Sequence, residues 1–453
     1  MNDTIVALST PPGVGAIHIV RLSGRGSFKM AEEISKVSLP QPGTAKLVNL
    51  YDRSGEVIDK ALIIVFKAPK TYTGEDMVEF HIHGNPVIAS ALISEILHLG
   101  ARLAEPGEFT RRALLNGKMS LSQVEALHEV IYGSNIASVK AAIRGVLGKY
   151  QYEIENIYDM ILKIASTMRA DVDYPEDVEL EEYGFSDRKK EYLSRVEEIF
   201  SRLRVLYQRV EIGQKLQHGY KIVFVGAPNV GKSSILNALL GYERAIVSDI
   251  PGTTRDFVEA VHMIKDIPVS LIDVAGIRDA TDDIEKVGVE KAIEKAKEAD
   301  LLIWVVDSTR DLVDEDIRVW QQFREKIGII VINKVDIGNS IKELPNKLQS
   351  YNVPVVLISA KTGSGIEKLA DEISRLLKRY DYEPIYLSAR VLSHIKEAIG
   401  YLEEAKHLIE TNMPEIASID IERAGKQIGL VLGRGNISED VLDKLFATFC
   451  VGK

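Results

Sequence analysis

One short segment constrains the fold of this chain more than any other. Residues 226–233, Gly-Ala-Pro-Asn-Val-Gly-Lys-Ser, fit the phosphate-binding pattern G-x-x-x-x-G-K-[ST]. An apolar run at 221–225 predicts a strand before it, and residues 234–241 predict a helix after it. Glycines let backbone N–H groups turn toward phosphate oxygens, and a helix N-terminus favours anions. We therefore expect a nucleotide-binding α/β domain, with Lys232 on the β- and γ-phosphates and Ser233 on Mg²⁺.

Further motifs follow in the order that a GTPase requires. Asp273-Val-Ala-Gly276, Asn333-Lys-Val-Asp336 and Ser359-Ala-Lys361 each close an apolar run that predicts a strand. The carboxylate of Asp336 can accept hydrogen bonds from N1–H and N2–H₂ of guanine, whereas adenine has no such pair of donors. The motifs together therefore predict a guanine-nucleotide site.

The segment between these motifs predicts the remaining Mg²⁺ ligand. In Gly-Thr-Thr-Arg-Asp at 252–256, Thr254 is the favoured ligand and Thr253 is the alternative. The expected GTP contacts are Asn229, Val230, Gly231, Lys232, Ser233, Ser234, Ser248, Asp249, Ile250, Pro251, Gly252, Thr253, Thr254, Asp273, Val274, Ala275, Gly276, Asn333, Lys334, Asp336, Ser359, Ala360 and Lys361.

One position departs from the best-known GTPases. Ile277 follows Gly276, where Ras-type enzymes have a glutamine that orients the attacking water. Isoleucine has no polar atom for that task. Arg255 and Arg278 are candidate internal arginine fingers by charge, but we favour surface positions for both.

Changes of pattern along the chain predict its domains. Short β-rich runs separated by Gly- and Pro-rich turns indicate an α+β domain over residues 1–118. Apolar residues recur three or four positions apart and predict a helical domain over 119–218, resumed at 379–453. Two such stripes are expected, one at Ile154, Ile157, Ile161, Ile164 and Met168 and one at Leu193, Val196, Phe200, Leu203 and Tyr207. Strand-like runs alternate with helices over 219–378 and predict a doubly wound Ras-like domain, inserted into the helical one.

The composition restricts the partners and the cellular location that we expect. The 453 residues carry a formal net charge of -10, so an RNA partner would need a local basic patch. The single cysteine, Cys450, excludes an intrachain disulfide and favours a reducing, cytoplasmic location. No apolar run approaches the ~20 residues of a membrane-spanning helix.

Motifs along the whole chain resemble the MnmE (TrmE) family of tRNA modification GTPases. Besides the GTPase motifs they are Thr10-Pro-Pro-Gly13, Val20-Arg-Leu-Ser-Gly24, Tyr72-Thr-Gly-Glu-Asp76, Glu105-Pro-Gly-Glu-Phe-Thr110, Asn116-Gly-Lys118 and Phe449-Cys-Val-Gly-Lys453. The family usually ends in Cys-Ile-Gly-Lys, and this chain has valine in place of the isoleucine. The chain also has Asp-Val-Ala-Gly where the family usually has Asp-Thr-Ala-Gly.

The resemblance implies an enzyme of tRNA maturation. With a flavoprotein partner, MnmG (GidA), which supplies the flavin, family members add an aminomethyl or carboxymethylaminomethyl group to C5 of the wobble uridine. It also implies a homodimer, and a heterotetramer with that partner. The N-terminal domain would bind 5-formyl- or 5,10-methylene-tetrahydrofolate through Arg21, Glu79, Lys118 and Lys453, with Cys450 as a functional thiol there.

The resemblance also implies how GTP is hydrolysed although Ile277 stands in place of the glutamine. Family members use K⁺ in place of an arginine finger, and the matching ligands here are Asn229, Ser248, Ile250 and Thr253. A glutamate beyond the Asp273 motif orients the water when two G domains pair, and that position is Glu285.

Alternatives remain open at this stage. His81 and His83, with Glu79 on the same strand face, could hold a metal, although a structural or folate-lining role is favoured. Cys450 could be an inert thiol. For the whole protein, the alternatives are a ribosome-assembly switch of the Era or EngA type and a one-carbon transferase regulated by its G domain.

Overall fold

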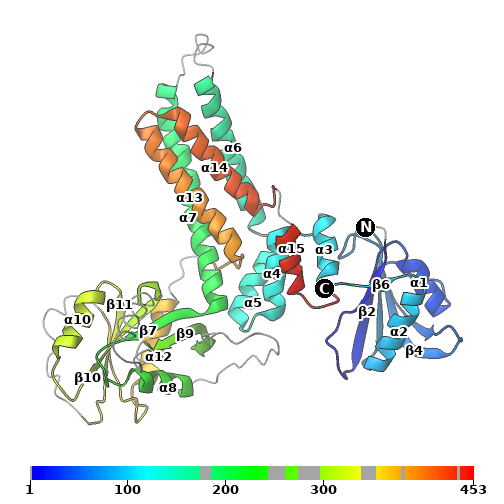
Figure 1. The fold of residues 1–453 in the computed structure, drawn as a ribbon, viewed down its shortest axis with the longest axis horizontal. Coiled ribbons are helices and arrows are strands. Elements are labelled where there is room, and N and C mark those ends of the chain that lie inside the picture. The colour runs from blue at the N-terminus through cyan, green and yellow to red at the C-terminus, as the bar shows by residue number, and fades with distance from the viewer. Residues whose placement is uncertain are drawn as a thin grey trace. The chain divides into compact units, whose positions relative to one another are not determined.

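The computed structural model describes most of the chain (Figure 1). The described residues are 3–173, 185–242, 261–273, 296–337, 353–378, 383–435 and 439–453. They form two compact units. The first comprises Met1–His128, Val146–Asp177 and Pro414–Lys453, and the second comprises Glu129–Gly145 and Val178–Met413.

The N-terminal part of the first unit is a six-stranded sheet in the order β3-β4-β5-β2-β1-β6. Its strands are β1 (Ile5–Leu8), β2 (Ile17–Ser23), β3 (Ala45–Tyr51), β4 (Val57–Phe66), β5 (Met77–His83) and β6 (Arg102–Leu103). All neighbours are antiparallel except β1 and β6. Helices α1 (Ser27–Ser35) and α2 (Pro86–His98) cover one face, where Val20, Phe80 and Leu92 are fully buried (Figure 1). An α+β domain is therefore present where the turns and alternating runs predict one.

Two elements of this sheet escape sequence reading. Strand β3 is an edge strand whose Ala45, Lys46 and Leu47 are all exposed, so apolar alternation is weak there. Strand β6 has only two residues and exists because the chain passes beside β1. Neither strand carries enough local signal to be distinguished from a loop.

Part of the opposite face of the sheet, around β1 and β2, is also covered. Helix α3 (Glu108–Leu115) places Phe109 against Ile5 and Ala7 there. Helix α15 (Glu439–Ala447) packs on α3, and Phe446 and Phe449 form a small core with Val124 of α4 (Leu121–Tyr132). Residues 450–453, the C-terminal tail, then pass over the start of α3.

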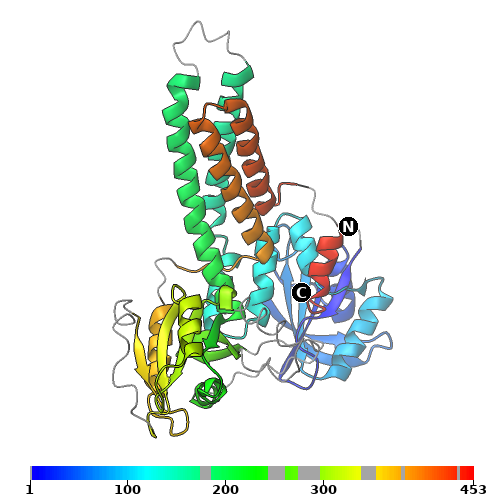
Figure 2. The same ribbon diagram turned by 60° about the vertical axis from the view of Figure 1, so that its left-hand side comes forward.

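Long helices form one pair in each unit. In the first unit α6 (Gln151–Asp173) packs along α14 (Pro414–Val431), and in the second α7 (Phe185–His218) packs along α13 (Ala389–Glu410) (Figure 2). The stripe expected on α6 is confirmed, since Ile154, Ile157, Ile161, Ile164 and Met168 are all buried. On α7 the buried stripe is Tyr192, Val196, Ile199, Leu203, Leu206 and Val210, which differs from the expected Leu193, Val196, Phe200, Leu203 and Tyr207. The α7 prediction was wrong at three positions, because a neighbouring apolar row faces the core.

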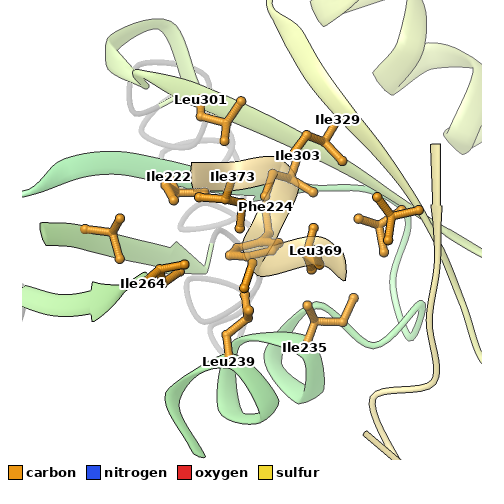
Figure 3. Close-up of a cluster of buried hydrophobic side chains, with 14 of the residues drawn as sticks. Ile222, Phe224, Ile235, Leu239, Ile264, Leu301, Ile303, Ile329, Leu369 and Ile373 are labelled. Carbon is orange, nitrogen blue, oxygen red and sulfur yellow. The ribbon is translucent and has the colours of Figure 1, made fainter. Parts of the chain in front are cut away.

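The inserted domain is a second six-stranded sheet, ordered β12-β11-β10-β7-β9-β8. Its strands are β7 (Tyr220–Val225), β8 (Val261–Ile264), β9 (Ile267–Asp273), β10 (Leu301–Asp307), β11 (Ile327–Asn333) and β12 (Val355–Leu357). Helices α8 (Lys232–Tyr242) and α12 (Ile366–Leu377) cover one face, where Phe224, Ile303 and Leu369 point toward one another (Figure 3). Helix α10 (Asp314–Phe323) covers the other face with Trp320. The doubly wound architecture is confirmed.

One strand of this sheet is not parallel. β8 pairs with β9 in the antiparallel sense. The turn between them is Lys265-Asp266, and both residues have positive φ (48° and 67°). Such turns match the twist of a tight hairpin, which explains the antiparallel edge.

The segment that leaves this domain is held against α7 and α5 (Ile136–Val146). Ile385 N–H donates to the Arg209 carbonyl at 3.1 Å, and Tyr386 N–H donates to the Ala141 carbonyl at 3.2 Å. A Cβ on Gly213 would lie 2.1 Å from the Ile385 carbonyl oxygen, so only glycine allows this approach. Among the helices described, none is long and apolar enough to cross a membrane.

Candidate functional site

The phosphate-binding loop lies between β7 and α8. Gly226, Asn229 and Gly231 all have positive φ (151°, 60° and 96°). A Cβ on Gly226 would lie 2.3 Å from the Val305 carbonyl oxygen, so the loop can turn back over β10 only with glycine there. The strand–loop–helix context that the motif requires is thus present.

The polar side chains of this loop sit at the start of α8. The Lys232 ammonium donates to the carbonyls of Gly226 and Ala227 at 2.8 and 2.9 Å, so it lies inside the curve of the loop. Ser233 and Ser234 are exposed in the first turn of the helix. Because the first backbone N–H groups of a helix have no partner within it, this end is suited to phosphate.

Asn333 ties three segments of the nucleotide site together. Its amide nitrogen donates to the Val230 carbonyl at 2.9 Å, and its amide oxygen accepts from the Ala360 N–H at 3.1 Å. The phosphate loop, the Asn333 motif and the Ser359 motif therefore share one side chain. Ser359 is buried, whereas Lys361 and Asp336 are exposed, which leaves the Asp336 carboxylate accessible to a base.

Asp307 is a residue of this site that the sequence analysis did not include. It ends β10 beside Asn333 and accepts from the Lys334 ammonium at 2.6 Å. The available signal is a carboxylate at the carboxyl end of a fully buried strand, next to the strand that leads into the phosphate loop.

Several predicted residues lie outside the described part of the chain. They are Ser248, Asp249, Ile250, Pro251, Gly252, Thr253, Thr254, Val274, Ala275, Gly276 and Glu285, together with Arg255, Ile277 and Arg278. Asp273 is described as the last residue of β9. The roles expected for this group stay predictions.

A second cluster forms around Arg21 on the sheet face opposite α1 and α2. Its guanidinium donates to Glu79 Oε1 at 2.9 Å and to the Gly452 carbonyl at 3.1 Å. The guanidinium carbon lies 5.8 and 5.7 Å from the ring centres of Tyr72 and Phe109. The structure thus brings together residues that are 431 positions apart in the chain.

The tail is fixed at this cluster by the start of α3. Gly107 N–H and Phe109 N–H donate to the carbonyls of Cys450 and Lys453. These N–H groups have no partner within their own helix, so the tail satisfies them. Burial, and then the positive charge of Arg21, lower the pKa of the Lys453 ammonium. Cys450 is exposed, which argues against an inert core thiol.

Other predicted residues of this region have separate partners. The Lys118 ammonium donates to the Pro69 carbonyl at 3.0 Å, and its stem passes Gly74. His81 lies 3.3 Å from Glu79, whereas His83 pairs with the buried Asp59 at 2.7 Å. Within the described residues, no group of three or more metal-binding side chains is found.

The sheet, the phosphate loop and the Asn333 bridge define the class of this protein, which is a P-loop GTPase. Residues 4–118 match the family model described as the GTP-binding protein TrmE N-terminus, and residues 121–450 match the MnmE helical domain. The chain therefore belongs to the MnmE (TrmE) family of tRNA modification GTPases.

Relatives match over the full length. The tRNA modification GTPase MnmE of Aquifex aeolicus is 40% identical over 458 residues, covering 100% of both chains. The protein of the same name from Thermotoga petrophila is 37% identical with the same coverage. Among solved structures, the G domain of the T. maritima FeoB iron transporter is 28% identical, with a TM-score of 0.26, over 35% of this chain and 99% of that one.

Proposed function

We propose that this chain hydrolyses GTP in order to drive modification of C5 of the wobble uridine in tRNA. It acts with a flavoprotein partner of the MnmG (GidA) type and uses a tetrahydrofolate one-carbon donor. The supporting observation is that the chain matches both family models and joins its C-terminal tail to Arg21 of the N-terminal domain. The added group is aminomethyl or carboxymethylaminomethyl.

Nucleoside mass spectrometry of tRNA tests the central proposal. In a strain lacking this protein, the C5-modified wobble uridine is expected to disappear, and the wild-type gene should restore it. A Lys232→Ala gene should fail to restore it, because the lysine lies inside the phosphate loop. Unchanged wobble uridine in the deletion strain would refute the proposal.

Potassium supplies the missing positive charge in the proposed hydrolysis. Asn229, the described member of the proposed ligand set, is held at φ 60° in the phosphate loop. A monovalent cation beside the phosphates stabilises the charge that develops in the transition state. GTP turnover should be faster in KCl than in NaCl at equal ionic strength, and equal rates would exclude this mechanism.

The folate site is proposed at the Arg21 cluster. Arg21 has a charged donor group between two aromatic rings, and Glu79 holds it there. Arg21→Gln should weaken 5-formyl-tetrahydrofolate binding about tenfold or more, measured by calorimetry. Arg53→Gln is the matched control, because Arg53 is 63% exposed in its pair with Glu95 and such pairs contribute little.

A homodimer is proposed through the uncovered part of the N-terminal sheet. Leu47 and Leu62 are cross-strand partners on that face, and they are 55% and 42% exposed. Leu62→Lys should therefore shift the protein toward monomer in sedimentation. Val87→Lys on α2, which covers the other face, is the control and should leave the dimer intact.

A further inference from the structure

Asp307 is a buried carboxylate that accepts hydrogen bonds from Thr309 and from Lys334 of the nucleotide site. It is 7% exposed at the end of β10. Its Oδ1 accepts from Thr309 N–H at 2.9 Å and from the Thr309 hydroxyl at 2.7 Å, while its Oδ2 accepts from the Lys334 ammonium at 2.6 Å. Burial alone would raise the pKa of Asp307, but the bonds from Lys334 and Thr309 outweigh it and lower the pKa.

The Lys334 ammonium carries this restraint to the phosphate loop. It also donates to the Asn229 carbonyl at 2.8 Å, so it bridges a carboxylate and a loop peptide. Both Lys334 and Asn229 have positive φ (66° and 60°), which is uncommon for residues with side chains. One ammonium group thus joins two residues in unfavourable backbone conformations, and the same group is bound by Asp307.

A second hydrogen bond runs beside the bond from Lys334 to Asn229. Asn333 donates to the Val230 carbonyl, and Lys334 donates to the Asn229 carbonyl. Two adjacent residues of the Asn333 motif therefore bind two adjacent carbonyls of the phosphate loop. The direction of the Asn229 side chain follows from that backbone.

We propose that Asp307 is a positioning residue that holds Lys334 across the nucleotide site and thereby sets the backbone of Asn229. Through Lys334, Asp307 affects binding of the guanine base. Through Asn229, it affects binding of the proposed K⁺. The cation part rests on the proposed function of Asn229 as a K⁺ ligand. The base part rests only on the geometry of the guanine site.

The test is a double-mutant cycle on the full-length protein, read by binding of fluorescent GDP. Asp307→Asn keeps the shape but faces the ammonium with an amide, so GDP affinity should fall about tenfold or more. Asp311→Asn, an exposed carboxylate in the following loop, is the matched control and should bind as wild type. Once Lys334→Ala is present, adding Asp307→Asn should cause no further loss.

Two further variants, and the KCl dependence of Asp307→Asn, test the same contacts of Asp307. Thr309→Ala removes one orienting hydroxyl and should weaken GDP binding about two- to threefold, while Asp307→Glu should recover part of the affinity lost in Asp307→Asn. Asp307→Asn should also raise the KCl concentration needed for half-maximal GTP turnover.

The outcomes separate the two proposals. Wild-type GDP affinity in Asp307→Asn, or additive losses in the cycle, would overturn the positioning role. Equal wild-type rates in KCl and NaCl would remove the cation proposal and leave the GDP result standing.

Discussion

Single residues decide whether the nucleotide site can form. Gly231 is the clearest case, because a Cβ there would lie 2.3 Å from the Asn333 amide nitrogen and the backbone has φ 96°. Any side chain at this position must displace the group that joins the phosphate loop to the guanine motif.

Gly231→Ala should therefore abolish tight GTP binding and destabilise the domain by about 2–4 kcal/mol. Chemical denaturation and fluorescent GDP binding would measure both effects. Gly241→Ala is the control, because its Cβ would meet nothing within 4 Å on the exposed end of α8. That variant should bind normally and gain about 0.5–1 kcal/mol.

Residues of the nucleotide site differ in how far sequence alone could place them. The phosphate loop and the Asn333 motif have fixed spacings at strand ends, so their positions were predictable. Asp307 has no motif, since its role depends on the register that puts it beside Asn333. The C-terminal tail was expected near Arg21 only from the family resemblance, because nothing local relates positions 431 residues apart.

At the scale of elements, α4 supports the residues that lead from α15 into the C-terminal tail. His128 meets Phe449 edge to face at 5.3 Å. Burial lowers the pKa of His128 below the ordinary 6.5, against a smaller opposing effect of a bond with the Thr448 backbone. The folded state thus favours the neutral imidazole, whereas the unfolded chain takes up a proton more easily.

The sign of the pH dependence follows from this difference. The stability contributed by His128 is complete above pH 6.5 and is lost as the pH falls through the lower folded value. His128→Phe should remove this part of the acid sensitivity, measured by denaturant unfolding on both sides of pH 6.5. His98→Gln, at an exposed position on α2, should leave the wild-type profile unchanged.

The segment that leaves the inserted domain lies against α7, and this contact gives a second prediction at the scale of elements. Gly213→Ala would push a methyl group into the Ile385 peptide and should cost about 2–4 kcal/mol. Gly400→Ala on α13 has open space around its Cβ and should instead stabilise by about 0.5–1 kcal/mol. Equal stabilities of the two variants in urea would show that the segment does not lie against α7.

Elements were predicted well where one face is buried and poorly elsewhere. The α6 stripe repeats every three or four residues and was placed correctly, because its five members all lie on the buried face. Helix α7 has a second apolar row, with Tyr192, Ile199 and Leu206, so the period alone could not choose between them. The β8 hairpin depends on two positive φ angles that lysine and aspartate seldom adopt.

For the whole molecule, the two tryptophans report on one domain. Trp304 and Trp320 lie with ring centres 5.1 Å apart on the α10 face of the inserted sheet. The N-terminal sheet has its own core, so its folding is expected to be separable.

GDP with Mg²⁺ should therefore raise the stability reported by tryptophan fluorescence. The expected gain is about 2.7 kcal/mol at a hundredfold excess over Kd. 5-Formyl-tetrahydrofolate should leave this transition in place while it protects the N-terminal domain in hydrogen exchange. Equal shifts from both ligands would indicate that the molecule unfolds as one unit.

The bond between Arg21 and Gly452 also has a consequence for synthesis on the ribosome. The two residues are 431 positions apart, which corresponds to roughly 20–90 s of translation at ~5–20 residues per second. During that interval the N-terminal sheet can fold, but the tail that covers the start of α3 has not yet been made. Locking of the Arg21 cluster is therefore among the last events in the maturation of each molecule, long after its sheet has formed.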